Sequence, residues 1–401
     1  MFDFADRMVI AAVLPRIKET WQLTDARSGL LSSALSLCMA LFALPVGILI
    51  DRWSRTKMAG LMGMLWCLAS GAGALVSNFP QLLFSRAVVG AGEAGYLPAS
   101  ITWAATAFPL RRRQLALGLL LSSQSVGIVF GLIAGSVIAT YFGWRYALGL
   151  LAIPGFVVAA LIYRSQDYQS ATPAAAERAS LKGEGLRLIW RTPSLWLVYL
   201  VLALLTLSSL PLAYFMPTFF HRVHGVSLQQ AAYMSSAIML LGALAGPLGG
   251  WWMDRKSHLR PQGKLAFAIS AFGLAMLLHT LAFGVATGLY DRFALLLLAG
   301  FAGYSAVSAI FAITQELAPQ HRRAFSATCG IVTAHLLGSM PGPWVAGMLS
   351  DAYGLTHALL IMTVVCEGLA CVILLLVMHF YMRDFRRTKP YRLAASGVGV
   401  Q

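Results

Sequence analysis

Charged side chains are scarce in this sequence. Asp, Glu, Lys and Arg make up 11% of its 401 residues, whereas an ordinary soluble domain has about 25%. Hydrophobic residues make up 58% and the mean hydropathy is +0.72, which excludes a soluble globular enzyme. The five cysteines lie in apolar runs, are odd in number and have no paired metal-ligand spacing, so neither a disulfide scaffold nor a zinc site is expected.

Long apolar runs dominate the chain instead. A helix that crosses a bilayer needs about 20 mostly apolar residues. A shorter run, Met1–Leu14, is ended by Pro15, Arg16 and Lys18, and we interpret it as the second half of a first helix whose beginning is truncated. The sequence therefore predicts an all-α integral membrane protein of twelve helices. The eleven full spans are expected at 26–50, 58–77, 81–107, 114–140, 144–163, 194–220, 228–253, 265–288, 292–317, 325–350 and 355–382.

Acidic residues are the rarer charged class, with 15 Asp and Glu against 30 Lys and Arg and a net charge of +15. In a soluble chain this balance would indicate nucleic-acid binding. Here most Lys and Arg lie in every second connection and in the tail, as expected of cytoplasmic loops. We therefore expect no nucleic-acid partner, cytoplasmic termini, and a place in a bacterial inner or plasma membrane.

The only long connection is polar and divides the spans six and six. We expect an N-terminal six-helix half at 1–163, a cytoplasmic linker at 164–193, a C-terminal half at 194–382 and a cytoplasmic tail at 383–401. Two such halves with a site between them at the midplane are the plan of a rocking secondary transporter.

An internal repeat supports the two halves. A Gly-x-x-x-Asp-Arg motif follows the second span and recurs after the eighth. Its charges lie at the predicted cytoplasmic ends of helices, where they can latch a closed state. The expected latch residues are Gly47, Asp51, Arg52, Arg55, Gly250, Asp254 and Arg255.

Ionisable residues at membrane depth are the leading site candidates, because such residues are costly unless they pair or meet water. Glu93 follows Arg86 by seven residues, which returns to nearly the same helix face. We predict that the two line one cavity and that Glu93 carries a proton; a fixed structural pair is the alternative. Asp6 is either a second proton site or the partner of Arg86.

Polar residues within the spans predict a substrate wall. Gly127, Gly131 and Gly135 indicate close helix packing instead. The sequence has no Walker loop, Ser-His-Asp order or His-x-x-x-His pattern, so no cofactor, metal or enzymatic activity is expected. The predicted substrate-binding residues are Arg86, Ser123, Gln124, Tyr214, Phe215, His335 and Glu367.

Twelve spans and the Gly47-x-x-x-Asp51-Arg52 motif resemble the major facilitator superfamily. The finer pattern is similar to its spinster branch, through Asp6-Arg7, Gly92-Glu93-Ala94-Gly95 and His335-Leu336-Leu337-Gly338. The resemblance implies proton-coupled movement of lysolipids or sphingoid phosphates, as in eukaryotic members. It also implies that Asp6 and Glu93 form the protonating pair, with Arg86 as their switch or as the anion partner of the substrate.

Together these features predict a monomeric, proton-driven transporter that works by alternating access. Its partners are expected to be protons, membrane lipids and an amphiphilic or anionic organic substrate, with a lysolipid-like molecule favoured. Two alternatives remain open. One is an organic-anion:proton symporter for small carboxylates or sugar acids, and the other is a non-transporting membrane receptor or a membrane enzyme.

Overall fold

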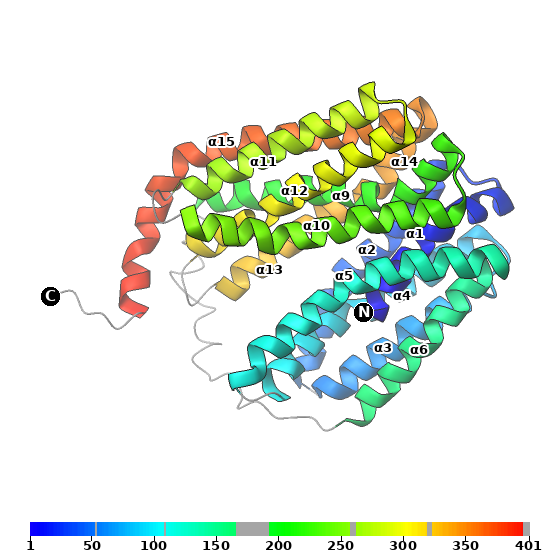
Figure 1. Cartoon of the computed structure of the whole chain (residues 1–401). Coiled ribbons are helices and arrows are strands. Elements are labelled where there is room, and N and C mark those ends of the chain that lie inside the picture. The colour runs from blue at the N-terminus through cyan, green and yellow to red at the C-terminus, as the bar shows by residue number, and fades with distance from the viewer. Residues whose placement is uncertain (53, 108–109, 166–191, 257–261, 319–322, 396–401) are drawn as a thin grey trace. The chain divides into compact units, whose positions relative to one another are not determined.

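The computed structural model describes residues 1–52, 54–107, 110–165, 192–256, 262–318 and 323–395 (Figure 1). Within these ranges the regular structure is entirely helical. The helices before the linker are α1 (Phe2–Trp21), α2 (Asp25–Arg52), α3 (Arg55–Ala72), α4 (Phe79–Ala107), α5 (Leu110–Tyr141) and α6 (Trp144–Arg164). After it come α9 (Pro193–His224), α10 (Leu228–Lys256), α11 (Gly263–Thr280), α12 (Leu289–Leu317), α13 (Arg323–Ala334), α14 (Pro341–Tyr353) and α15 (Leu355–Ala395).

The helices confirm the predicted twelve-helix membrane fold. Eight described helices are long and apolar enough to cross a bilayer by themselves. The others include α1 and α4, which carry charges in their interiors. Helices are expected in the apolar interior of a bilayer, because the backbone N–H and C=O groups of a helix form hydrogen bonds with one another.

The predicted end of the first helix is wrong. Pro15 lies inside α1, which continues to Trp21 and ends where Gln22 adopts a left-handed φ of 49°. Proline removes only one backbone donor, and the surrounding residues Leu14 and Ile17 are buried, so packing outweighs that loss. Arg16 and Lys18 are thus helical residues near its end rather than a loop that follows it.

The predicted span 325–350 is also interrupted. A π-helical turn, His335–Ser339, separates α13 from α14, and a second one, Leu281–Val285, continues α11. At the first turn Gly338 lies against Thr206 and the Ala203 carbonyl, too close for any side chain. Thr206 also donates a hydrogen bond of 2.9 Å to the Ala334 carbonyl. In a regular helix that carbonyl would accept only a backbone N–H group from the next turn.

One compact unit comprises Met1–Ser170, Leu210–Leu240 and Ser339–Leu359. In it α1 packs against α5 and α6, α4 against α2 and α3, and α14 against α2. Glycines permit the closest approaches, as predicted: a side chain on Gly131 of α5 would overlap the Ala5 carbonyl of α1. The unit thus contains segments from before and after the linker. The division of the spans into two groups of six stays a prediction from the sequence repeat.

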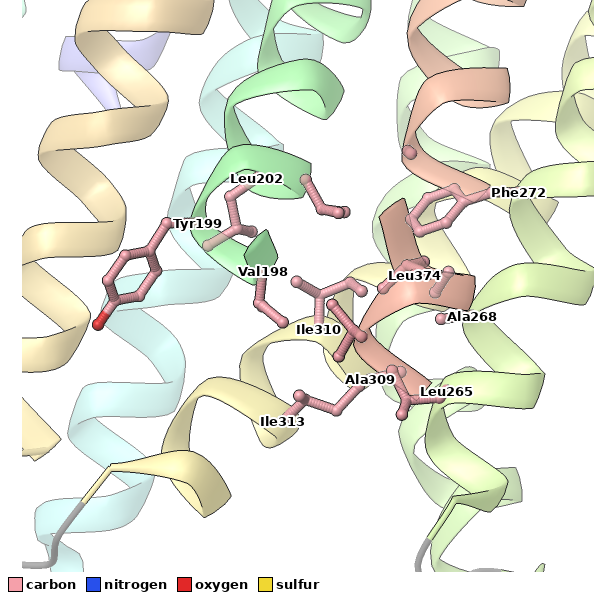
Figure 2. Packing of buried hydrophobic residues seen from close by; sticks show 14 of the residues in the cluster. Val198, Tyr199, Leu202, Leu265, Ala268, Phe272, Ala309, Ile310, Ile313 and Leu374 are labelled. Atoms are coloured by element: carbon pink, nitrogen blue, oxygen red, sulfur yellow. The ribbon is translucent and has the colours of Figure 1, made fainter. Parts of the chain in front are cut away.

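The second unit comprises Ala171–Ser209, Leu241–Gly338 and Leu360–Gln401. Its core is an apolar cluster contributed mainly by α9, α11, α12 and α15. Figure 2 shows Val198 and Leu202 of α9 beside Ile310 of α12, with Leu374 of α15 and Phe272 of α11 next to them. Because lipid chains are as apolar as these side chains, close packing rather than escape from water holds such helices together.

Candidate functional site

Five charged side chains from α1 and α4 meet in the interior of the first unit. Helix α1 contributes Asp3, Asp6 and Arg7, and α4 contributes Arg86 and Glu93. The side chain of Glu93 is 0% exposed, that of Arg86 1% and that of Arg7 21%. Charges so deep in a membrane protein persist when they are paired or when they meet water.

Arg86 forms the buried end of this cluster. Its Nη1 lies 3.1 Å from Oδ2 of Asp6, and its Nη2 donates a hydrogen bond of 3.1 Å to Oγ of Ser70 on α3. Ser70 in turn donates to the other Asp6 oxygen, so the three groups close a ring. Both oxygens of Asp6 are therefore satisfied, as a buried carboxylate requires.

Arg7 forms the more open end. Its Nε lies 2.7 Å from Oε2 of Glu93, and its Nη2 lies 3.5 Å from Oδ1 of Asp3. Among the described residues neither Glu93 oxygen accepts a well-directed hydrogen bond, despite the short ion pair. One guanidinium thus serves two carboxylates, and Glu93 is held by charge more than by hydrogen bonds.

Arg86 and Glu93 do not pair directly, so the alternative of a fixed pair between them does not hold in this structure. Seven residues of helix return to the same face, but they also rise about 10 Å along the axis, which is too far for a direct contact. Two residues of α1 lie beside this stretch of α4 and pair with its charged side chains. Asp6 forms an ion pair with Arg86, and Arg7 forms one with Glu93. The sequence predicts Asp6 to be either a second proton site or the partner of Arg86. The structure shows Asp6 as the partner of Arg86.

The described members of the substrate wall occupy different settings in the first unit. Ser123 and Gln124 on α5 are half-buried, and the Ser123 hydroxyl bonds its own helix at Leu120. Tyr214 and Phe215 on α9 are buried. The Tyr214 hydroxyl donates a hydrogen bond of 2.9 Å to the Ser28 carbonyl, and the two rings pack edge to face, so both residues serve packing in this structure.

Glu367 and His335 belong to the second unit. Glu367 on α15 is buried, and its Oε1 lies 3.0 Å from Nδ1 of His279 on α11. The His279 ring stacks on Phe283 at the π-helical turn. His335 begins the other π-helical turn and is half-buried. Sequence inspection missed His279, because a single histidine in an apolar run carries no signal for a partner 88 residues away.

Most of the predicted latch lies outside the described side chains. This applies to Gly47, Asp51, Arg52, Arg55 and Asp254. Gly250 is half-buried near Ser308, and Arg255 is exposed with its guanidinium over the Trp251 ring. The latch therefore stays a prediction.

A second charged cluster in the first unit was not predicted. It is centred on Asp25 at the start of α2, whose two oxygens receive a bidentate pair from Arg222 of α9 at 2.7 and 2.8 Å. Lys18 of α1 and the Ser350 hydroxyl of α14 contact the same carboxylate. Asp351 accepts hydrogen bonds from the backbone N–H groups of Asp25 and Ala26. The cluster thus ties α2 to helices encoded after the linker.

The apolar spans are those of a multi-pass integral membrane protein, and its interior holds buried ion pairs. The profile of the Major Facilitator Superfamily matches residues 1–343. The chain therefore belongs to the major facilitator superfamily. It is a transporter and not an enzyme.

Individual relatives agree with this assignment. The chain is 26% identical over 398 residues to an MFS-type efflux pump of Mycolicibacterium smegmatis, covering 95% of this chain and 91% of the pump. It is 26% identical over 381 residues to protein spinster homolog 1 of Xenopus tropicalis, covering 88% and 71%. These matches confirm the resemblance to spinster-like members.

A solved structure supports the fold. It is the crystal structure of a bacterial homologue of the human lysosomal transporter Spinster in an inward-facing, occupied conformation. The two chains superpose with a TM-score of 0.81 at 22% identity, and the match covers 96% of this chain and 95% of the other.

Proposed function

We propose that this protein moves an amphiphilic or anionic organic molecule across the membrane by alternating access, coupled to protons. One observation carries the proposal: the cluster of α1 and α4 holds three carboxylates but two guanidinium groups. When all five side chains are ionised, this group of side chains carries one net negative charge. Such a charge is costly in a low-dielectric interior, and one bound proton removes it.

The geometry favours Glu93 as the group that takes this proton. Asp6 is held by Arg86 and Ser70, whereas Glu93 shares Arg7 with Asp3 and lacks a well-directed hydrogen bond among the described residues. A proton on Glu93 weakens its hold on the guanidinium of Arg7. Proton binding and the availability of that cation are therefore linked.

Arg7 is then the cation that an anionic substrate group can reach. Its side chain is 21% exposed, whereas that of Arg86 is 1% exposed and is paired with Asp6 and Ser70. We therefore propose Arg7 as the anion partner and Arg86 with Asp6 as the anchor that holds α1 against α4. The resemblance of the sequence to the spinster branch implies a substrate that joins an anionic head to an apolar chain, such as a lysolipid.

The test uses sealed proteoliposomes and records proton movement when substrate is added. The panel contains lysophospholipids, sphingoid phosphates and small organic anions. We expect a signal for the wild type that is lost in Glu93→Gln. Glu19→Gln is the matched control, because Glu19 is an exposed carboxylate whose ion-pair partner, Arg16, is exposed too.

Normal gradient-driven flux in Glu93→Gln would overturn the assignment of the proton site. A response to small carboxylates or sugar acids alone would replace the amphiphile with the organic-anion symporter. Ligand binding without flux in any sealed preparation would show a receptor.

A further inference from the structure

A groove of about 560 Å³ lies in the first unit, where α3 ends and α4 begins. Ala69, Ala72, Leu75, Phe84 and Ser85 are among the residues that line it. Its volume falls within the roughly 300–1,000 Å³ that is typical of small-molecule sites. Its lining is almost wholly apolar, so its occupant must be apolar as well.

The outer wall of the groove is open rather than covered. Leu75 is 84% exposed and Phe84 is 71% exposed, and Ala72, the last residue of α3, is exposed too. In a multi-pass membrane protein an exposed apolar surface of this kind is suited to contact with acyl chains.

A cation contacts the backbone of one residue that lines the groove. Arg145, at the start of α6, donates a hydrogen bond of 3.2 Å from Nη2 to the carbonyl of Val76, which also lines the groove. Its guanidinium lies 4.3 Å from the ring centre of Trp144 and 5.8 Å from that of Trp21. Tryptophan is enriched where a membrane protein meets the headgroup layer.

The guanidinium of Arg145 has capacity for an anion. Arginine carries five N–H donors, and in the part of the chain that the structure describes Arg145 donates one hydrogen bond, to Val76. Forked N–H groups of this kind match phosphate oxygens. An apolar groove with such a cation beside it has the polarity pattern of an anionic lipid.

We propose that this groove binds one acyl chain of an anionic bilayer phospholipid whose phosphate contacts Arg145. The site does not use Arg7 or Glu93, so it is independent of the proposed transport function. Ala69 and Ser85, which line the groove, directly precede Ser70 and Arg86 of the buried anchor on α3 and α4. Ser85 also donates a hydrogen bond of 2.8 Å to the Ala69 carbonyl. The lipid thus braces the two helices that carry Ser70 and Arg86.

Native mass spectrometry of the full-length protein in detergent tests the site, with phosphatidylglycerol, phosphatidylcholine and a lysophospholipid as probes. We expect the wild type to retain phosphatidylglycerol preferentially. Arg145→Gln should lower that retention by about fivefold, the effect of one basic side chain at an anionic surface. Ala72→Trp fills the groove at an exposed position, leaves Arg145 in place, and should lower the retention of both lipids.

The matched controls are Arg16→Gln, an exposed cation of α1, and Leu161→Trp, which adds a ring on the exposed side of α6. Both should retain phosphatidylglycerol as the wild type does. Phosphatidylglycerol should also raise the thermal unfolding midpoint of the wild type and not that of Ala72→Trp. Unchanged retention in both groove variants would overturn the proposal. So would retention of lysophospholipid alone, which would make the groove a substrate site.

Discussion

Asp6 and Glu93 are both buried carboxylates next to an arginine, but their surroundings differ. Asp6 and Ser70 both bind the guanidinium of Arg86. The Asp6 and Arg86 side chains are 2% and 1% exposed. Asp6→Asn leaves the Arg86 charge buried without its counter-ion, and breaking a buried pair in this way costs about 3–5 kcal/mol. We expect the free energy of unfolding, measured by denaturant titration in detergent, to fall by that amount.

Glu19→Gln serves as the comparison for Asp6→Asn, because its ion pair with Arg16 is exposed. An exposed pair contributes about 0–1 kcal/mol. Equal stability of the two variants would contradict an anchoring role for Asp6.

Asp3 tests the charge count of the cluster directly. Asp3→Asn removes the third carboxylate, so two acids face two guanidinium groups and no proton is needed for balance. We expect substrate binding in this variant to depend little on pH across the neutral and mildly acidic range. The wild type should change its affinity there. Equilibrium binding at a series of pH values measures this, and a wild-type profile in Asp3→Asn would argue against the charge-balance mechanism.

At the scale of helix pairs, the packing of α5 against α1 depends on missing side chains. A Cβ on Gly131 would overlap the Ala5 carbonyl, whereas one on Gly135 would lie 3.3 Å from Cα of Val9. Overpacking costs about 1–3 kcal/mol. We therefore expect Gly131→Ala to lower the thermal unfolding midpoint more than Gly135→Ala does.

Gly273 on α11 gives the matched reference for this series. No atom lies within 4 Å of its Cβ position in the described structure, so Gly273→Ala adds no clash. Alanine also favours a helix over glycine by about 0.5–1 kcal/mol, so this variant should be neutral or stabilised. The same change in the unfolding midpoint at all three positions would show that contact with α1 does not set the effect.

The sequence predicts the helices better than their partners. Each span is visible because an apolar run of bilayer length must form a helix, and the spacing of Gly127, Gly131 and Gly135 marks a close contact. The partner of Glu93 could not be read in this way. Arg86 lies on the same helix face, but the choice between it and Arg7 depends on where α1 lies beside α4. That placement comes from packing over the whole helix.

At the scale of the molecule, alternating access requires that contacts between segments on the two sides of the linker form and break. The Asp25 cluster is such a contact, since Arg222 and Ser350 come from α9 and α14. Close packing accompanies it: a side chain on Gly347 would overlap the Asp25 carbonyl, and one on Gly29 the Pro343 carbonyl. Ion pairs set in tight packing are suited to a contact with two discrete states.

Ser28 reports on whether this contact is closed. It is 0% exposed, and its carbonyl accepts the hydrogen bond from Tyr214. In a background with the five native cysteines replaced by alanine, Ser28→Cys should react slowly with a membrane-impermeant maleimide. Arg222→Gln removes the bidentate partner of Asp25 and should raise that rate about fivefold or more, the effect of about 1 kcal/mol on a two-state equilibrium. Arg27→Gln neutralises an exposed neighbouring cation and should leave it unchanged. Equal rates in all three proteins would mean that the cluster does not control opening at this end of the unit.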